Sequence, residues 1–174
     1  MTLTELLKKA LDLRKTYYSD TVSCFHWDYK HIADLLSIDH PNIPHNILEH
    51  FIAKHSNQWF EIMKDLEEID VKDVVVELRE FSTSEIFNQD IMDIAPFSGY
   101  GDYRKPTDIK YTKDDSYFIG LVKGTWDYPI VAWEQNGKLH IIDGTNRFRR
   151  FYLYNQMGFD HIKDKHLVYV MHPK

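Results

Sequence analysis

The chain has 174 residues, 43% of them hydrophobic and 28% charged, which is typical of a globular domain rather than a disordered segment. A formal net charge of -6 and a pI near 5.9 argue against a surface that binds duplex DNA along its length. Cys24 is the single cysteine of the sequence, which excludes an internal disulfide and a cysteine-rich metal site.

The first part of the sequence favours helices. Residues 2–18 carry an amphipathic pattern that Thr2 or Thr4 can cap. The apolar stripe of this helix consists of Leu3, Leu6, Leu7, Ala10, Leu11 and Leu13. A second helix is predicted over residues 20–36, with Val22, Phe25, Ile32, Leu35 and Leu36 as core candidates.

Two prolines, Pro41 and Pro44, interrupt the helical pattern within residues 40–46. A long helical pattern then covers residues 46–68. We therefore expect a helical extension over residues 1–70 that packs on the rest of the chain. The sequence carries neither the long apolar core of a signal peptide nor a run of membrane-spanning length, so we expect a cytoplasmic protein that does not enter a membrane.

The pattern changes at Val71, where β-branched residues predict a strand over residues 74–81. A helix-cap signal and a short turn or helix follow at residues 82–90. Residues 94–115 contain most of the local breakers and predict a long loop, and a short helix is expected over residues 116–124.

A hairpin that leads directly into a basic helix is the most specific feature of the sequence. Two short strands meet at Asn136-Gly137, a pair suited to positive φ at both central positions of a tight turn. The second strand, residues 138–142, stops at Asp143-Gly144. A helix is predicted to begin near Thr145 or Asn146, with one of them as its N-cap. A closing strand is expected over residues 166–171.

This order of elements predicts an α+β fold, with a helical extension over residues 1–70 and an α+β domain over residues 71–174.

The start of the basic helix favours the binding of an anion. Free backbone N–H groups, the helix dipole and the guanidinium groups of Arg147, Arg149 and Arg150 come together there, and phosphate is the anion they suit best. Asp143 is a candidate Mg²⁺ ligand, or a catalytic carboxylate that orients an attacking hydroxyl. The alternative is a structural Asp-Gly turn in which Asp143 forms an ion pair with Arg147.

The segment Asp143-Gly144-Thr145-Asn146-Arg147 resembles the Gly-x-x-Arg turn of the ParB/sulfiredoxin superfamily, in which a hairpin leads into this turn and a helix. Residues 84–89, SEIFNQ, resemble the segment after the first strand of that superfamily. The resemblance covers about residues 71–174 and leaves the helical extension outside it.

This resemblance implies a ParB/sulfiredoxin-like mixed sheet with a site for ATP or CTP, usually with Mg²⁺. Its implied nucleotide-binding residues are Gly144, Thr145, Asn146, Arg147, Arg149, Arg150 and Gln89. Thr145 stands where sulfiredoxins carry a cysteine, which argues against sulfiredoxin chemistry.

The histidines and tryptophans are weaker candidates for a functional site, because structural roles also explain them. Histidines five residues apart, such as His26 and His31, lie on different faces of a helix and do not suit a zinc site. Trp126 and Trp133 suit either the core or base stacking.

The sequence thus predicts a nucleotide-binding protein that acts as an NTP-dependent phosphotransferase or NTPase. The alternatives are a catalytically inactive protein that binds a protein partner, such as a host or defence factor, through its N-terminal helices, and a metal-dependent nuclease that uses Asp143.

Overall fold

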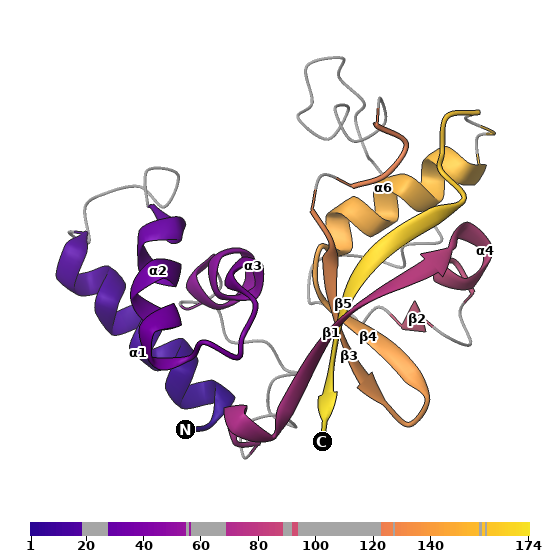
Figure 1. Cartoon of the computed structure of the whole chain (residues 1–174). Coiled ribbons are helices and arrows are strands. Elements are labelled where there is room, and N and C mark those ends of the chain that lie inside the picture. Colours follow the sequence, from indigo (N-terminus) through magenta and orange to yellow (C-terminus); the bar gives the residue numbers. More distant parts are fainter. Residues whose placement is uncertain are drawn as a thin grey trace. The chain divides into compact units, whose positions relative to one another are not determined.

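A computed structural model describes residues 1–18, 28–54, 56, 69–88, 92–93, 123–126, 128–156, 158 and 160–174 (Figure 1). Within these residues the chain is α+β, as predicted, with helices first and a mixed sheet after them. It forms two compact units, Met1–Val76 with Pro173–Lys174, and Glu77–His172.

Helix α1 (Leu3–Tyr17) confirms the first predicted helix. Thr2 caps it, because its hydroxyl accepts from the Glu5 amide at 3.2 Å while the Glu5 carboxylate accepts from the Thr2 amide at 2.8 Å. The buried stripe consists of Leu3, Leu6, Leu7, Ala10 and Arg14. The apolar pattern predicted Leu13 in the buried stripe, but Arg14 is buried there instead. Its Nη1 donates to the Ser56 hydroxyl at 2.7 Å.

Helix α2 (Tyr29–Asp39) starts and ends later than the predicted range. Asp28 sets its start, because the Asp28 carboxylate accepts from the His31 amide at 3.0 Å. Of the predicted core residues, Ile32 and Leu36 are buried and Leu35 is half-buried, whereas Val22 and Phe25 lie outside the described residues.

The proline break is confirmed, since α2 ends at Asp39 and the next helix starts only after Pro44. Helix α3 (His45–Ile47) runs into a π-helical turn, η2 (Leu48–Ala53), and a 3₁₀ turn, η4 (Val71–Asp73), comes before the sheet. Most of the long helix predicted over residues 46–68 lies outside the described residues.

Among the described residues the sheet has five strands in the order β1-β5-β3-β4-β2. The strands are β1 (Val74–Ser82), β2 (Met92–Asp93), β3 (Ile130–Gln135), β4 (Lys138–Asp143) and β5 (Lys165–Pro173). The β3–β4 hairpin is antiparallel, whereas β2 pairs with β4 and β3 pairs with β5 in parallel. The strands predicted from residues 74, 138 and 166 are therefore confirmed, each extending slightly further than the pattern indicated.

Helix α6 (Thr145–Gln156) lies along one side of this sheet and supplies Phe148 and Phe151 to the core (Figure 1). Helix α4 (Thr83–Ile86) follows β1 and begins at a capping box of Ser82 with Glu85. The core cluster consists of Ile86, Met92, Trp126, Ile130, Ala132, Leu139, Ile141, Phe148, Phe151, Val168 and Val170. Trp126 is thus a core residue, which was one of its two predicted roles.

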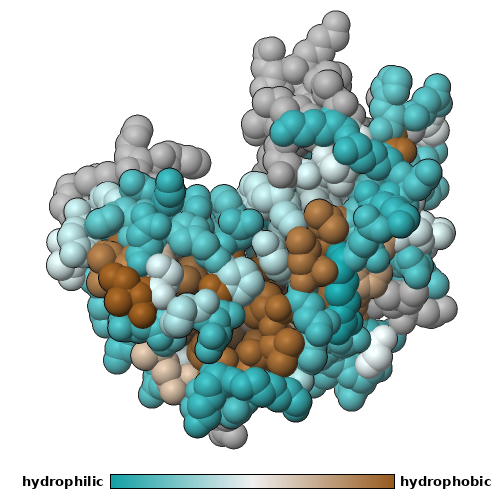
Figure 2. Space-filling model, viewed as in Figure 1, coloured by the Kyte–Doolittle hydropathy of each residue, from teal (hydrophilic) through white to brown (hydrophobic). Residues whose placement is uncertain are grey.

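Most of the face seen in Figure 2 is hydrophilic, with apolar residues gathered in patches. The large apolar residues exposed in the described part of the chain are Met1, Tyr17, Ile38, Leu78 and Leu167. None of the helices in that part has the length and apolar character needed to cross a membrane.

Candidate functional site

The hairpin turn has the predicted geometry, with φ of 52° at Asn136 and 74° at Gly137. Strand β4 continues through Asp143, and α6 begins at Thr145. The Gly144 carbonyl accepts from the Phe148 amide at 2.9 Å, so Gly144 occupies the position before the helix. The helix thus begins at Thr145, as predicted, but Gly144 rather than Thr145 or Asn146 occupies the N-cap position, because the helix already includes both of those residues.

Gly144 has a φ of 95°, a conformation in which side chains are strained. A Cβ atom at this position would lie 2.5 Å from Ile130 Cγ2 and 2.9 Å from Arg147 Nη2. The turn therefore requires glycine for internal packing. Its predicted role, to let a phosphate approach the backbone, stays a prediction.

Arg147 forms a closed set of contacts at the start of α6. Its Nη2 donates to Asp143 Oδ2 at 2.7 Å, and its Nη1 donates to the Tyr128 carbonyl at 2.6 Å. Its Cζ lies 3.8 Å from the centroid of the Tyr128 ring. The two side chains of the ion pair are only 10% and 5% exposed, so each charge compensates the other inside the protein.

This arrangement is the one expected for a structural Asp-Gly turn. It does not fit a metal ion on Asp143 Oδ2, because that oxygen already accepts from a guanidinium group. No group of three or more His, Cys, Asp or Glu side chains suited to a metal ion is present among the described residues. The predicted roles of Asp143 in catalysis and metal binding would therefore have to use Oδ1, or would require Arg147 to release Oδ2.

The other predicted site residues differ in how they are placed. Thr145 and Arg150 are half-buried, whereas Arg149 is buried. Asn146 lies in the first turn of α6 with its side chain outside the described part, and Gln89 lies outside it altogether.

The segment after β1 packs against α6. The ring of Phe87 lies 5.5 Å from that of Phe148 and 5.4 Å from that of Tyr152, both edge to face. Phe148 follows Arg147 directly in the sequence. The end of α4 and the start of α6, far apart in the sequence, therefore lie side by side.

A second polar cluster, which the sequence reasoning missed, surrounds His166. This histidine is only 1% exposed. The hydroxyl of Thr125 lies 2.9 Å from its Nδ1, and the hydroxyl of Thr83 lies 3.1 Å from its Nε2. The available signal was the alternation of the last strand, since His166 shares the inward-facing parity of Val168 and Val170.

Hydrogen-bond donors fix which nitrogen of His166 carries the proton. Thr83 donates its hydroxyl proton to the Lys163 carbonyl at 2.7 Å, so toward His166 it can only accept. Nε2 is therefore protonated. Burial lowers the pKa of His166 to about 4, so the ring is neutral at pH 7 and Nδ1 is an acceptor. It follows that Thr125 donates its hydroxyl proton to Nδ1.

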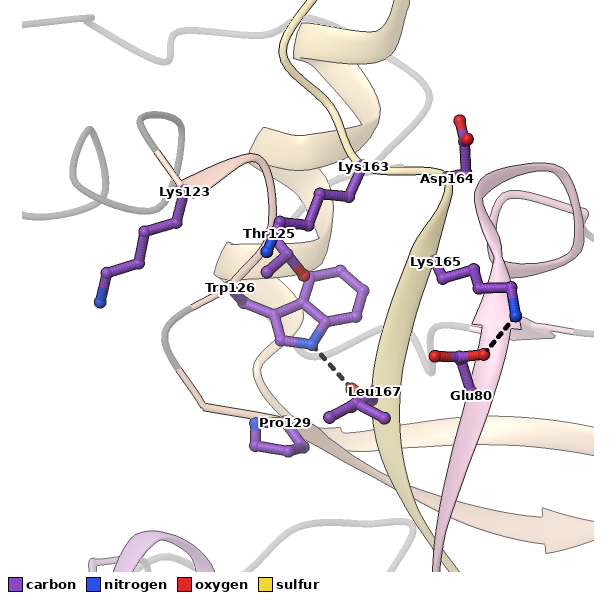
Figure 3. A pocket seen from close by; sticks show the side chains of 9 residues that line it. All are labelled: Glu80, Lys123, Thr125, Trp126, Pro129, Lys163, Asp164, Lys165 and Leu167. Atoms are coloured by element: carbon purple, nitrogen blue, oxygen red, sulfur yellow. Dashed lines mark hydrogen bonds and ion pairs between the residues drawn. The ribbon is translucent and has the colours of Figure 1, made fainter.

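Thr125 also lines an open cavity of about 670 Å³ (Figure 3). The cavity is lined by Glu80, Lys123, Thr125, Trp126, Pro129, Lys163, Asp164, Lys165 and Leu167. None of the residues predicted from the helix start is among them.

No family model, curated protein or solved structure matches the chain. The resemblance of residues 71–174 to the ParB/sulfiredoxin superfamily therefore stays a prediction.

Proposed function

We propose that the chain is a nucleotide-binding protein of the ParB/sulfiredoxin type, which holds the phosphates of ATP or CTP at the start of α6. The contact of Phe87 with Phe148 carries this proposal. It brings the segment after β1 beside the first turn of α6, and the resemblance assigns both segments to one nucleotide site.

Local physics supports a phosphate at this position. Strand β4 ends at Asp143 and α6 follows after one residue, so the amides of the first turn lack acceptors within the helix. The positive end of the helix dipole lies at the same point. The first-turn amides and Thr145 would bind the phosphates, and Mg²⁺ would arrive with them, neutralising their charge.

Arg147 acts in this proposal as a positioning residue. Its contacts with Asp143 and the Tyr128 carbonyl hold the end of β4, the segment two residues before β3 and the first turn of α6 in one arrangement. Arg150, which is half-buried and on the same helix, is the better candidate for direct contact with a phosphate.

Catalytic turnover requires a further group at the site, in addition to those that bind the phosphates. A phosphotransferase or NTPase needs a group that orients the attacking hydroxyl or water, and Asp143 is the predicted one. Because its Oδ2 accepts from Arg147, Asp143 would take that role through Oδ1, or through Oδ2 after nucleotide binding has opened the ion pair.

The test is calorimetric titration of the full chain with ATP and with CTP in the presence of MgCl₂, followed by a phosphate-release assay. We expect at least one nucleotide to bind, and Arg150→Met to weaken binding about tenfold, because a charge-assisted hydrogen bond is lost. Lys138→Met, on the exposed end of the hairpin, is the matched control. Absence of binding of both nucleotides by the wild type would refute the proposal.

A second candidate, a non-catalytic protein that binds a partner through its N-terminal helices, is favoured by the closed Asp143–Arg147 pair. It predicts neither nucleotide turnover nor cleavage of plasmid DNA with Mg²⁺ or Mn²⁺. Phosphate release that is lost in Asp143→Asn would exclude it, and plasmid cleavage lost in the same variant would instead point to the nuclease.

A further inference from the structure

The cavity beside Trp126 has walls that hydrogen bonds hold in place. The Lys163 amide donates to the Gly124 carbonyl at 2.8 Å, and the indole of Trp126 donates to the Leu167 carbonyl at 2.7 Å. The Thr83 amide donates to the Asp164 carbonyl at 2.9 Å. Three segments that are far apart in the sequence are thereby joined, so the cavity exists before any ligand arrives.

Gly124 shows how closely two of these segments approach. It has a φ of 69°, and a Cβ atom at this position would lie 2.1 Å from the His161 carbonyl oxygen. Only glycine fits there without moving the backbone. The volume of about 670 Å³ lies within the range of small-molecule sites.

Charge is distributed unevenly around the cavity. Lys165 is engaged by Glu80, with 2.6 Å between its Nζ and Oε1 of the glutamate. The carboxylate of Asp164 points away from the other lining side chains, whereas Lys163 extends toward Thr125 (Figure 3). The side of the cavity at Thr125 thus has a lysine ammonium group next to it, although the whole chain has a net charge of -6.

Thr125 restricts what can bind next to that lysine. Its one hydroxyl proton is donated to His166 Nδ1, so its oxygen offers only lone pairs to the cavity. A ligand group beside Thr125 therefore has to donate a hydrogen bond.

The remaining wall is apolar. Pro129, the ring of Trp126 and the 42% exposed side chain of Leu167 form it. An apolar ligand body that covered Leu167 would remove hydrophobic surface from water.

From this arrangement we propose that the cavity binds a small organic carboxylate with an apolar body and an N–H or O–H donor next to the acid group. The carboxylate pairs with Lys163, the donor bonds to Thr125, and the apolar body lies against Pro129 and Leu167. N-acylated apolar amino acids have this chemistry. The site is separate from the proposed nucleotide site and does not depend on it.

The test uses N-acetyl-L-leucine and its neutral amide, N-acetyl-L-leucinamide, titrated into the full chain and followed by NMR chemical shifts. We expect the acid to bind about tenfold more tightly than the amide, because a hydrogen bond to a charged group is worth that much. Equal binding of acid and amide, or no binding of the acid, would overturn the proposal.

Variants separate the contributions. Lys163→Met should abolish the preference for the acid, whereas Lys138→Met, at an exposed position that does not line the cavity, should keep it. Thr125→Val should weaken binding and Thr125→Ser should preserve it, and circular dichroism checks that both fold. Tighter binding of phenyl phosphate, with the same dependence on Lys163, would overturn the assignment to carboxylates.

Discussion

The start of α6 and the cavity beside Trp126 use their charges in opposite ways. At the start of α6 the guanidinium of Arg147 is enclosed by Asp143 and Tyr128 and is turned inward. Beside Trp126 the buried His166 is neutral, and the ammonium of Lys163 extends over the cavity.

This difference shows that the residues with the clearest sequence motif need not be the residues that a ligand can reach. The residues with the most specific sequence pattern are engaged in holding the turn between β4 and α6. The residues that line the open cavity come from three segments, none of which carries a recognisable motif. A charge that compensates another inside the protein stabilises a fold but has to be released before it binds a ligand.

The largest expected effect comes from opening the closed pair. Arg147→Met leaves the carboxylate of Asp143 buried without its guanidinium partner, and we expect the free energy of unfolding to fall by about 3–5 kcal/mol. Urea denaturation followed by circular dichroism measures it.

Lys138→Met, at an exposed position, is the control, and the double variant Asp143→Leu, Arg147→Met should regain most of the loss. If Arg147→Met and Lys138→Met unfold at the same urea concentration, the pair does not hold the turn.

The next largest effect is the loss of stability at low pH that the buried His166 causes. Burial lowers its pKa to about 4 from the ordinary 6.5, so the unfolded chain binds the proton more tightly than the folded chain. The contribution of neutral His166 to the free energy of unfolding is complete above pH 6.5. It is lost as the pH falls toward 4, and the total loss is roughly 3 kcal/mol.

Urea midpoints between pH 7.5 and pH 4.5 test this expectation. His166→Gln should flatten the dependence of the urea midpoint on pH. An unchanged slope in His166→Gln would show that other groups set the acid sensitivity.

Two glycines of the hairpin region give a matched pair. Gly137 and Gly144 both have positive φ, but a Cβ atom at Gly137 would meet nothing within 4 Å, whereas at Gly144 it would meet Ile130 at 2.5 Å. We expect Gly137→Ala to cost about 1 kcal/mol through backbone strain and Gly144→Ala about 2 kcal/mol more through overpacking. Thermal unfolding of both variants compares them, and equal costs would mean that the turn accommodates a side chain.

The smallest effect is expected at the cavity rim. Lys165 and Glu80 are 67% and 50% exposed, so water screens their ion pair. Lys165→Met should leave the urea midpoint unchanged within error. A clear loss of stability would show that the rim of the cavity is held by charge rather than by the hydrogen bonds of Gly124 and Trp126.

Features that depend on neighbouring residues could be predicted from the sequence. The capping boxes at Thr2 and Ser82, the Asn136-Gly137 turn and the proline break each involve contacts within a few positions. The alternative that Asp143 pairs with Arg147 was also available, because the two are four residues apart and one turn of helix brings them together.

Contacts with distant segments could not be predicted in this way. Nothing near Arg147 in the sequence indicates that the Tyr128 carbonyl is its second acceptor, and nothing near His166 names Thr83 and Thr125 as its partners. The arginine pattern indicated a phosphate site, but which guanidinium is enclosed depends on the strands packed beside it.

The sequence by itself determined the α+β class, the hairpin and the basic helix that follows it, because turn chemistry and periodicity act within short stretches of chain. Only the tertiary structure decided that Arg147 faces inward and that Lys163 extends over an open cavity. The physical reason is that burial and hydrogen-bond partners come from distant segments of the chain, such as Thr83 and His166, which are 83 positions apart.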